Sequence, residues 1–517
     1  MRYTQQSRFE ELMSTRTSRA LKGSITGIIQ SVLAILFQLI LTPMILFYSG
    51  QEMLGGYAII MQVIGYGILL DFGFSTALAR YLCQAFDSHE NKHRFSELLT
   101  VGRNVLFITN LLAALLLVIA ALNIDTLARD SVAIQSQAQL ALGIMAIWVV
   151  ARTPLYIYNT ALTATQDMAT SNVIAIGVNL IRLLTALALT YYGFGLLGLV
   201  ISNIFAELCQ YAMQRAYFLK SYPIYLVRWG CGDTALGKEM LRFGFGYWGV
   251  NLAVVLLLGS DNIIAGALYG AASASVFYST KMLGSLTIQF ISRFIDNIYP
   301  ALNEMIGKNE HVAVKGVYLR MLRYILLLSI PSALGIALFA GALVTLWVGE
   351  KQYAGTVMAV SLSLFVFVQI LNHLHGIMTL ALGNLRHWPS LSIASGLLSV
   401  ALGYSIGKVL GMQWILLGMT LAMLPVLALL VYRVFHALEI KAADVFVNIL
   451  PAIYACAPLL AIIWIDDFLI VTPTLLNVAI TLIIYLLLWI TGTWFLGLNT
   501  IEKVQVRLLI SKTLQRS

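Results

Sequence analysis

The chain has 517 residues, of which 60% are hydrophobic and only 11% are charged, and its mean hydropathy is +0.86. Soluble domains carry about 45–50% apolar and about 25% charged residues. The composition therefore excludes a soluble enzyme with one membrane anchor, a transmembrane β-barrel and a disordered chain. With four Cys in the whole length, it also excludes a disulfide-built secreted protein. It predicts an all-α, polytopic membrane protein.

A transmembrane helix needs about 20 mostly apolar residues, and by this measure the sequence predicts about 14 of them. The first 23 residues are charged and lack a small-residue cleavage site, so we expect no signal peptide. The expected spans are 24–47, 57–79, 102–123, 138–160, 172–190, 195–217, 241–267, 274–299, 322–347, 354–381, 391–408, 412–434, 447–465 and 474–496.

The basic residues orient these spans. Most of the 32 Lys and Arg fall on the side of the N-terminus, and only Arg129, Lys351 and Lys408 fall on the other. Cytoplasmic loops of membrane proteins carry the excess of Lys and Arg. We therefore expect both termini in the cytoplasm.

The net charge of +9 does not indicate nucleic acid, because the basic residues are spread through loops and are not gathered with aromatics on one face. The amphipathic ends, 1–22 and 500–516, are instead expected to lie on the anionic inner leaflet. Membrane lipids are thus predicted partners, and nucleic acid is not.

An internal repeat organises the chain. A shift of 220 residues lays spans one to six onto spans seven to twelve with almost no gaps. Six spans per unit keep both halves in one orientation, which predicts two parallel six-helix bundles, an arrangement that many secondary transporters use for alternating access. The expected segments are a cytoplasmic N-terminus at 1–23, bundles at 24–217 and 241–435, a cytoplasmic linker at 218–240, two additional helices at 447–496 and a tail at 497–517.

Nothing in the loops indicates an enzyme. The external loops are short, and the linker 218–240 contains no catalytic motif. The sequence has no GxxxxGK[ST] phosphate loop. We therefore expect no catalytic residues, no metal and no cofactor.

Charged residues inside spans are costly, and by default they mark a function. The cations are Arg152, Arg182, Lys281 and Arg293, and the acids are Asp71, Glu207, Asp261 and Asp296. For the acids, the alternative to a functional role is ion pairing with the cations, for example Arg293 with Asp296 one turn later. Arg182 and Lys281 have no obvious local partner, which favours a ligand-binding role.

The eighth span carries a polar stripe. At about 100° per residue, its polar side chains fall within about one third of the helix circumference. They are Lys281, Ser285, Gln289, Ser292, Arg293 and Asp296. Because lipid cannot solvate such a stripe, it must face water or protein, and we expect this span to line a cavity.

The tenth span carries His373 and His375, whose titration lies nearest physiological pH. They are predicted proton sites, and the alternative is that they hydrogen-bond neighbouring helices. With Asp71, Glu207, Asp261 and Asp296 they form the candidates for coupling to H⁺ or Na⁺. Several guanidinium and ammonium groups in a partly dry site suit a phosphate or pyrophosphate. The predicted anion-binding residues are Arg152, Arg182, Lys281, Arg293 and Gln289.

Several segments resemble the multidrug/oligosaccharidyl-lipid/polysaccharide exporter superfamily, in particular its bacterial polysaccharide transporters, the O-antigen and capsule flippases. The resemblance is most specific in the first hundred residues. It rests on Lys22–Gly27, Leu54–Tyr57, Leu69–Phe74, Ala77–Tyr81, Asp261–Ile264 and Pro300–Leu302.

The resemblance implies a MATE-like fold of two six-helix bundles around a cavity that opens alternately to either side. It implies a flippase, important for O-antigen or lipopolysaccharide biosynthesis, that moves an undecaprenyl-pyrophosphate-linked glycan to the outer leaflet, coupled to an ion or to membrane potential as an antiporter would be. A polysaccharide polymerase and chain-length proteins would be its partners.

Three alternatives stay open. The two additional spans occur in lipid II flippases, which suggests a peptidoglycan-precursor substrate. A drug exporter of the same superfamily would favour acidic residues in the first span, and 24–47 has none. A non-transporting scaffold of a glycan-assembly complex would not need the polar stripe of the eighth span.

Overall fold

The structure, a computed structural model, describes residues 2–87, 92–127, 132–227, 230, 232–308, 310–383, 387–462, 474–500 and 502–504. Throughout these residues the regular structure is helical and there is no strand. Thirteen helical stretches are long and apolar enough to cross a membrane. One of them, Asn251–Gly307, overlaps two of the expected spans, 241–267 and 274–299, so each expected span overlaps one of these stretches. The chain is a polytopic all-α membrane protein.

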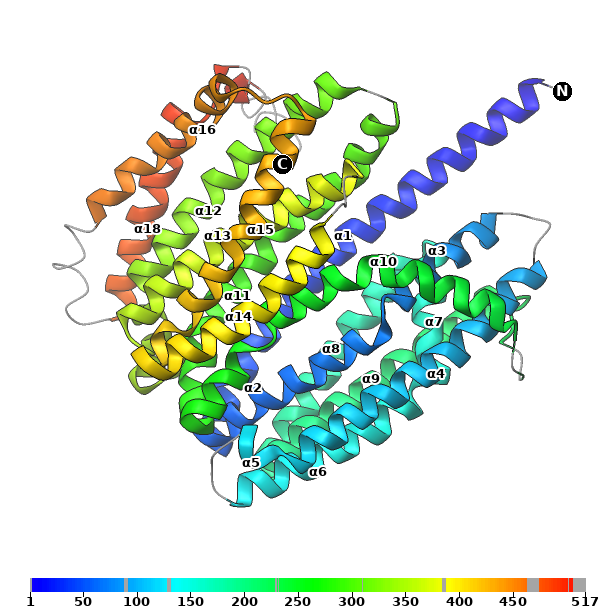
Figure 1. Cartoon of the computed structure of the whole chain (residues 1–517), viewed down its shortest axis with the longest axis horizontal. Coiled ribbons are helices and arrows are strands. Elements are labelled where there is room, and N and C mark those ends of the chain that lie inside the picture. Colours follow the sequence, from blue (N-terminus) through cyan, green and yellow to red (C-terminus); the bar gives the residue numbers. More distant parts are fainter. Residues whose placement is uncertain are drawn as a thin grey trace. The chain divides into compact units, whose positions relative to one another are not determined.

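The contacts divide the chain into two compact units. Unit 1 comprises Met1–Ser275 and Ser392–Gly396, and unit 2 comprises Val276–Leu391 and Leu397–Ser517. The helices of unit 1 (Figure 1) are α1 (Arg2–Ser49), α2 (Gln51–Tyr66), η1 (Gly67–Asp71), α3 (Phe74–Asp87), α4 (Lys92–Leu122), α5 (Ile124–Leu127), α6 (Val132–Ala151), α7 (Thr153–Ala164), α8 (Met168–Tyr191), α9 (Gly195–Ser221) and α10 (Thr234–Leu258). Helix α1 is continuous, so the expected N-terminal segment 1–23 runs into the first span without a break.

Helix α11 (Asp261–Gly307) begins in unit 1 and ends in unit 2, and α14 (Trp388–Leu410) belongs to both. The remaining helices belong to unit 2. They are α12 (His311–Val348), η2 (Glu350–Gln352), α13 (Thr356–Ala381), η3 (Met412–Trp414), α15 (Ile415–Ala437), α16 (Ala442–Cys456), η4 (Ala457–Leu460), α18 (Leu475–Gly492) and η5 (Thr493–Gly497). Most of the expected tail, from residue 505 on, lies outside the described residues.

The helix boundaries repeat along the chain. Helices α8 and α9 begin at Met168 and Gly195, and α14 and α15 begin 220 residues later, at Trp388 and Ile415. Gly50 ends the first helix with φ 87° and ψ 174°, and Gly270, inside α11, has φ 84° and ψ 171°. The shift seen in the sequence therefore recurs in the backbone.

Three of the expected spans are interrupted. The second breaks at η1 and the left-handed Phe72 and Gly73, the fourth at Arg152, and the seventh at Gly259–Ser260. Pro154, in the first turn of α7, explains the break at Arg152, because proline ends a helix a residue or two before itself. From the sequence, all three spans are expected to be continuous, and in this respect the expectation is wrong.

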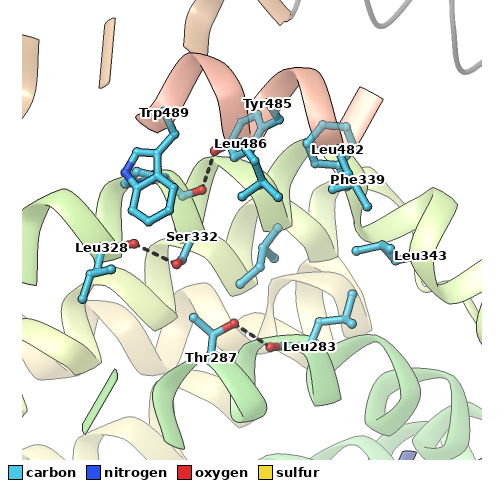
Figure 2. Close-up of a pocket in the computed structure, with 13 residues that line it drawn as sticks. Leu283, Thr287, Leu328, Ser332, Phe339, Leu343, Leu482, Tyr485, Leu486 and Trp489 are labelled. Carbon is cyan, nitrogen blue, oxygen red and sulfur yellow. Dashed lines mark hydrogen bonds between the residues drawn. The ribbon is translucent and has the colours of Figure 1, made fainter. Parts of the chain in front are cut away.

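The two C-terminal helices pack on α12, where Pro331 lies inside a span. Proline has no N–H and leaves the carbonyl four residues earlier, that of Leu327, without its helical partner. The Trp489 indole N–H donates to this oxygen at 2.9 Å, and the Tyr485 hydroxyl donates to the Pro331 carbonyl at 2.5 Å. Helix α18 thus satisfies the backbone that the proline disrupts (Figure 2).

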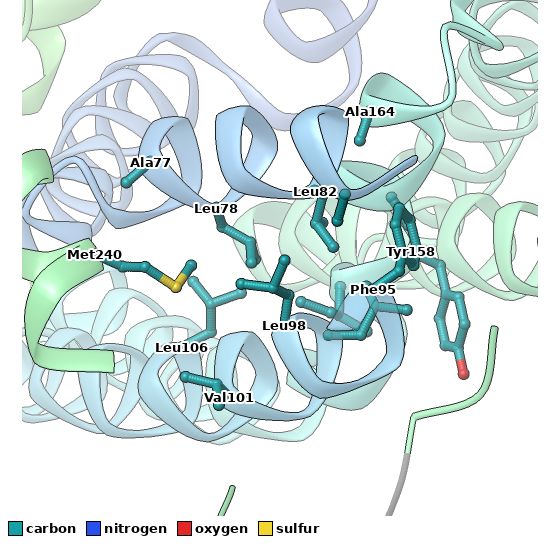
Figure 3. Close-up of a cluster of buried hydrophobic side chains, with 14 of the residues drawn as sticks. Ala77, Leu78, Leu82, Phe95, Leu98, Val101, Leu106, Tyr158, Ala164 and Met240 are labelled. Atoms are coloured by element: carbon teal, nitrogen blue, oxygen red, sulfur yellow. The ribbon is translucent and has the colours of Figure 1, made fainter. Parts of the chain in front are cut away.

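A hydrophobic cluster closes one end of unit 1 (Figure 3). Leu78 and Leu82 of α3 meet Phe95 and Leu98 of α4, and all four are fully buried. Tyr158 of α7 and Met240 of α10 complete the cluster, which packs the broken second span against the third, fourth and seventh.

Beside the cluster, α3 and α10 are also joined by a polar contact. The Tyr81 hydroxyl donates to the Glu239 carboxylate at 2.8 Å, and this contact with a negative charge raises the pKa of Tyr81. The cluster and this hydrogen bond together hold α3 against α10.

Candidate functional site

An ion pair lies inside the membrane-spanning part of unit 1. Arg152 Nη1 donates to Glu207 Oε2 at 2.8 Å, and the Trp148 indole N–H donates to the same oxygen at 2.8 Å. The two charged side chains are 20% and 21% exposed, and the Arg152 guanidinium lies 5.6 Å from the Tyr156 ring centroid. For these two residues, the ion-pairing alternative is what the structure shows.

Two further sequence-predicted residues, Asp71 and Arg182, lie near this pair. The Tyr211 hydroxyl is within electrostatic reach of Glu207, Arg152 and Arg182, and Tyr156 is within reach of Asp71 as well as of the pair. We call Asp71, Arg152, Arg182 and Glu207 the unit 1 charge cluster. Its members come from η1, from the break between α6 and α7, from α8 and from α9.

Arg182 differs from Arg152 in its partners. Its Nη1 donates to the neutral amide oxygen of Asn179 at 3.2 Å, and the Tyr57 hydroxyl lies nearby. Within the described residues no carboxylate pairs with Arg182, and its buried Nε has no hydrogen-bond partner. Arg182 therefore keeps a charge and donors that can serve a ligand.

Asp71 acts on the backbone at the break in the second span. Its Oδ2 accepts a hydrogen bond from the Ser75 N–H at 3.1 Å, in the first turn of α3. A carboxylate at a helix start satisfies an N–H that lacks a helical partner. Asp71 Oδ1 is buried, and the described residues offer it no partner.

The breaks in the second and seventh spans meet. Gln62 Nε2 donates to Asp261 Oδ1 at 2.5 Å, and its Oε1 accepts from the Ile263 N–H at 3.1 Å. The Tyr66 and Ser260 hydroxyls lie 2.5 Å apart. Asp261 is thus fully buried at the start of α11, where the Gln62 side chain of α2 binds it.

Close backbone contact also joins the break in the second span to α10. A Cβ atom on Gly73 would lie 2.5 Å from the Gly244 carbonyl oxygen, so these two backbones touch. Phe72 stacks on Phe245 with 5.2 Å between ring centroids, and the Trp248 indole N–H donates to the Leu69 carbonyl at 2.6 Å. The Leu69–Phe74 segment is therefore a structural joint between the second span and α10.

In unit 2, Asp296 of α11 pairs with His373 of α13. His373 Nε2 and Asp296 Oδ1 are 2.8 Å apart, and the side chains are 30% and 42% exposed. The expected pair of Asp296 with Arg293 one turn earlier is not formed. Of the other stripe residues, Arg293, Gln289 and Ser285 are exposed, whereas Lys281 is buried.

His375, two residues further on, has a structural environment. It is 2% exposed, its Nδ1 lies 2.7 Å from the Leu371 carbonyl, and its Nε2 lies 2.8 Å from the Tyr318 hydroxyl. Since a carbonyl only accepts, Nδ1 carries the proton and Nε2 accepts from Tyr318. For His375 the hydrogen-bonding alternative holds.

A cavity of about 340 Å³ lies between α11, α12 and α18 of unit 2 (Figure 2). Its walls are mainly Leu, Ile and aromatic side chains. Three of its polar side chains are already engaged by backbone carbonyls: Thr287 by Leu283, Ser332 by Leu328 and Tyr485 by Pro331. The cavity suits a hydrocarbon better than a sugar.

Sequence reasoning missed a second buried ion pair. Arg323 of α12 pairs with Glu502 beyond η5, each side chain being 6% exposed, and the Tyr324 hydroxyl also donates to Glu502 at 2.7 Å. From the sequence, Arg323 is interpreted only as one of the basic residues that orient the spans in the membrane. Hydropathy could not identify this contact, because the two residues are 179 positions apart in the sequence.

Among the described residues, no group of three His, Cys, Asp or Glu side chains is arranged to hold a metal.

Solved structures share this fold. A lipid II flippase MurJ in an inward closed conformation matches with TM-score 0.71 and 14% identity, covering 91% of this chain and 97% of that one. An inward-facing MATE multidrug resistance transporter of the MOP superfamily matches with TM-score 0.63 and 15% identity, covering 81% and 100%. The MATE multidrug transporter DinF-BH matches with TM-score 0.61 and 18% identity, covering 81% and 96%.

These matches show the fold, that of a multi-pass, all-helical membrane protein. A family model described as polysaccharide biosynthesis protein matches residues 50–357, more than half of the chain. The chain belongs to this family of polysaccharide biosynthesis proteins. No curated protein matches its sequence significantly.

Proposed function

We propose that the chain is a flippase for a polyprenyl-pyrophosphate-linked oligosaccharide, an O-antigen, capsule or exopolysaccharide repeat unit. It would move this lipid from the inner to the outer leaflet of the bacterial cytoplasmic membrane by alternating access, with both termini in the cytoplasm. The family and the fold support a transporter of a lipid-linked substrate and not an enzyme. An ion gradient would drive the cycle, and a polymerase and chain-length proteins would receive the product.

The proposal of a pyrophosphate-linked substrate rests mainly on Arg182. A guanidinium within a span is stable only with a counter-charge or a polar environment, and the described residues give Arg182 a neutral amide. A pyrophosphate would supply the missing negative charge and accept its hydrogen bonds, as guanidinium groups bind phosphates bidentately. Arg152 would contribute only in a state in which the substrate displaces Glu207.

The anionic headgroup and the isoprenoid tail of the substrate call for chemically different surfaces. The unit 1 charge cluster has the donors for an anionic headgroup. The cavity lined by Leu328, Phe339 and Leu482 in unit 2 has the apolar walls for part of an isoprenoid tail. Buried apolar surface is worth about 25 cal/mol per Å², so even a few isoprene units would bind measurably.

Complementation tests the role of Arg182. In a host that lacks the native gene, Arg182→Gln should reduce surface polysaccharide at least about tenfold, because removing a charged hydrogen-bond donor costs about 1.5–3 kcal/mol. The matched control is Arg320→Gln. Arg320 is exposed, and its Nε donates only to the Gly316 carbonyl of its own helix. Equal surface polysaccharide from both variants at equal protein level would refute the anion site.

The lipid intermediate that accumulates in cells without a working protein distinguishes between the candidate substrates. Mass analysis of polyprenyl intermediates would show an oligosaccharide repeat unit under the proposal and lipid II under the peptidoglycan alternative. Unchanged intermediates with altered sensitivity to cationic drugs would indicate the drug-exporting branch. Lost polysaccharide without stalled lipid intermediates would indicate a scaffold.

A further inference from the structure

The pair formed by His373 and Asp296 joins two membrane-spanning helices of unit 2. Asp296 lies in α11 and His373 in α13, with 2.8 Å between Nε2 and Oδ1. Both residues lie inside stretches apolar enough to cross a membrane. The side chains are nevertheless partly accessible, at 30% and 42% exposure. A titratable pair at an accessible helix contact is able to exchange a proton.

His375, in the same helix, provides a comparison, because its contacts are those of a histidine with a structural role. Both of its ring nitrogens are engaged by protein groups, and it is almost fully buried. For His373, the structure gives the Nε2 contact with Asp296 and partial exposure. Only the first of these environments holds the imidazole in one protonation state.

Within the described residues, no other ionisable group forms an ion pair with His373 or Asp296. On α11, Arg293 stands one turn before Asp296 and is exposed. On α12, Lys315 is paired with Asp444, Tyr318 with His375 and Arg323 with Glu502. The ionisable residues of α15 lie in its last two turns. They are Tyr432, Arg433 and His436.

We propose that His373 and Asp296 together form a proton-binding site that couples proton binding to the packing of α11 against α13. Its role in transport rests on the proposed flippase function. With a second proton on the imidazole ring, an imidazolium faces a carboxylate, and the contact is a charge-assisted hydrogen bond with no net charge. When that proton leaves to water, the carboxylate faces a neutral ring and the attraction between the helices weakens.

The coupling follows from linkage. A ligand shifts a conformational equilibrium when it binds one state better than the other, and here the proton is the ligand. The state in which α11 and α13 touch at this pair is favoured by the bound proton. The proton would therefore be the coupling ion, and Na⁺ would have no part at this pair.

Distances between spin labels test the site without any substrate. Labels would be placed on α11 by Asn303→Cys and on α13 by Leu380→Cys, with the native Cys replaced by Ala, in the full chain in nanodiscs of phosphatidylethanolamine and phosphatidylglycerol. When the pH is changed from about 5 to about 8, we expect the label distance to shift between two populations, because the bound proton favours one packing of the two helices. His373→Gln and Asp296→Asn should each make the distribution independent of pH, and His311→Gln, at the exposed start of α12, should not.

A second measurement connects the site to transport. In vesicles of the same lipids with a trapped pH-sensitive dye, farnesyl pyrophosphate would serve as the probe, and we expect it to change internal pH in the unsubstituted protein and not in His373→Gln. Arg182→Gln should abolish the probe response and keep the pH-dependent distances, so failure of the anion site and of the proton site can be told apart. Label distances that stay constant with pH, or that still shift in both pair variants, would overturn the proposal.

Discussion

Gly50 and Gly270 hold nearly the same backbone conformation, φ 87° and ψ 174° against φ 84° and ψ 171°, although 220 residues separate them. Each precedes the second span of its half of the repeat. This region of backbone space is essentially restricted to glycine. The repeat therefore preserves a turn as well as a hydropathy pattern, and this turn sets where the second and eighth spans begin.

Substituting this glycine should destabilise the fold through the backbone alone. A Cβ on Gly50 would meet nothing within 4 Å, so Gly50→Ala should cost about 1–3 kcal/mol from strain. Gly65→Ala is the matched control, because Gly65 lies in α2 with equally open space and alanine favours a helix by about 1 kcal/mol. Thermal unfolding in detergent should show opposite shifts, and equal shifts would contradict the assignment of the turn.

Trp489 should matter because of Pro331. Trp489→Phe removes the N–H that satisfies the Leu327 carbonyl, and leaving a buried acceptor unpaired costs about 1–3 kcal/mol. In Pro331→Ala the alanine N–H can bind this carbonyl, so Trp489→Phe should then cost much less. A double-mutant cycle on unfolding free energy measures the difference. Additive effects would show that the indole does not act on the proline break.

The pair of Arg152 with Glu207 should behave as a unit. Glu207→Gln leaves the guanidinium without its counter-charge, and we expect a loss of about 1–3 kcal/mol, reduced from the value for a dry pair because both side chains are partly exposed. The double variant Arg152→Gln with Glu207→Gln should recover part of this stability. If the double variant is less stable than Glu207→Gln alone, the Glu207 carboxylate does not compensate the charge of Arg152.

The contact of Arg323 with Glu502 should hold the C-terminal segment on α12. Both side chains are buried, so Glu502→Gln should cost about 3–5 kcal/mol, as breaking a buried pair does. The exposed pair of Lys308 with Glu304 provides the control, and Glu304→Gln should leave the unfolding temperature essentially unchanged. Limited proteolysis should release the segment after residue 499 in the first variant only. An unchanged cleavage rate there would argue against a holding role.

Hydropathy was sufficient to place the spans, because burial of about 20 apolar residues in lipid depends on composition and not on the fold. It could not show where spans break. The interruption at Gly259–Ser260 depends on Gln62 and Tyr66 from another span, and only folding brings these groups together.

The sequence suggests candidate residues for the site but not their pairing. Intramembrane charges are few, so the sequence identified Arg152, Arg182 and Glu207. It could not identify their partners, since Arg152 and Glu207 lie 55 residues apart. The same limit explains Asp296, which was expected to pair with its helical neighbour Arg293 and is bound by His373 from another helix.

The most direct test of the account is a deletion of the gene in its native host, followed by analysis of polyprenyl-linked intermediates in each leaflet. The account predicts loss of surface polysaccharide and accumulation of undecaprenyl-pyrophosphate repeat units in the inner leaflet. Normal surface polysaccharide, with repeat units still reaching the outer leaflet at the normal rate, would contradict it.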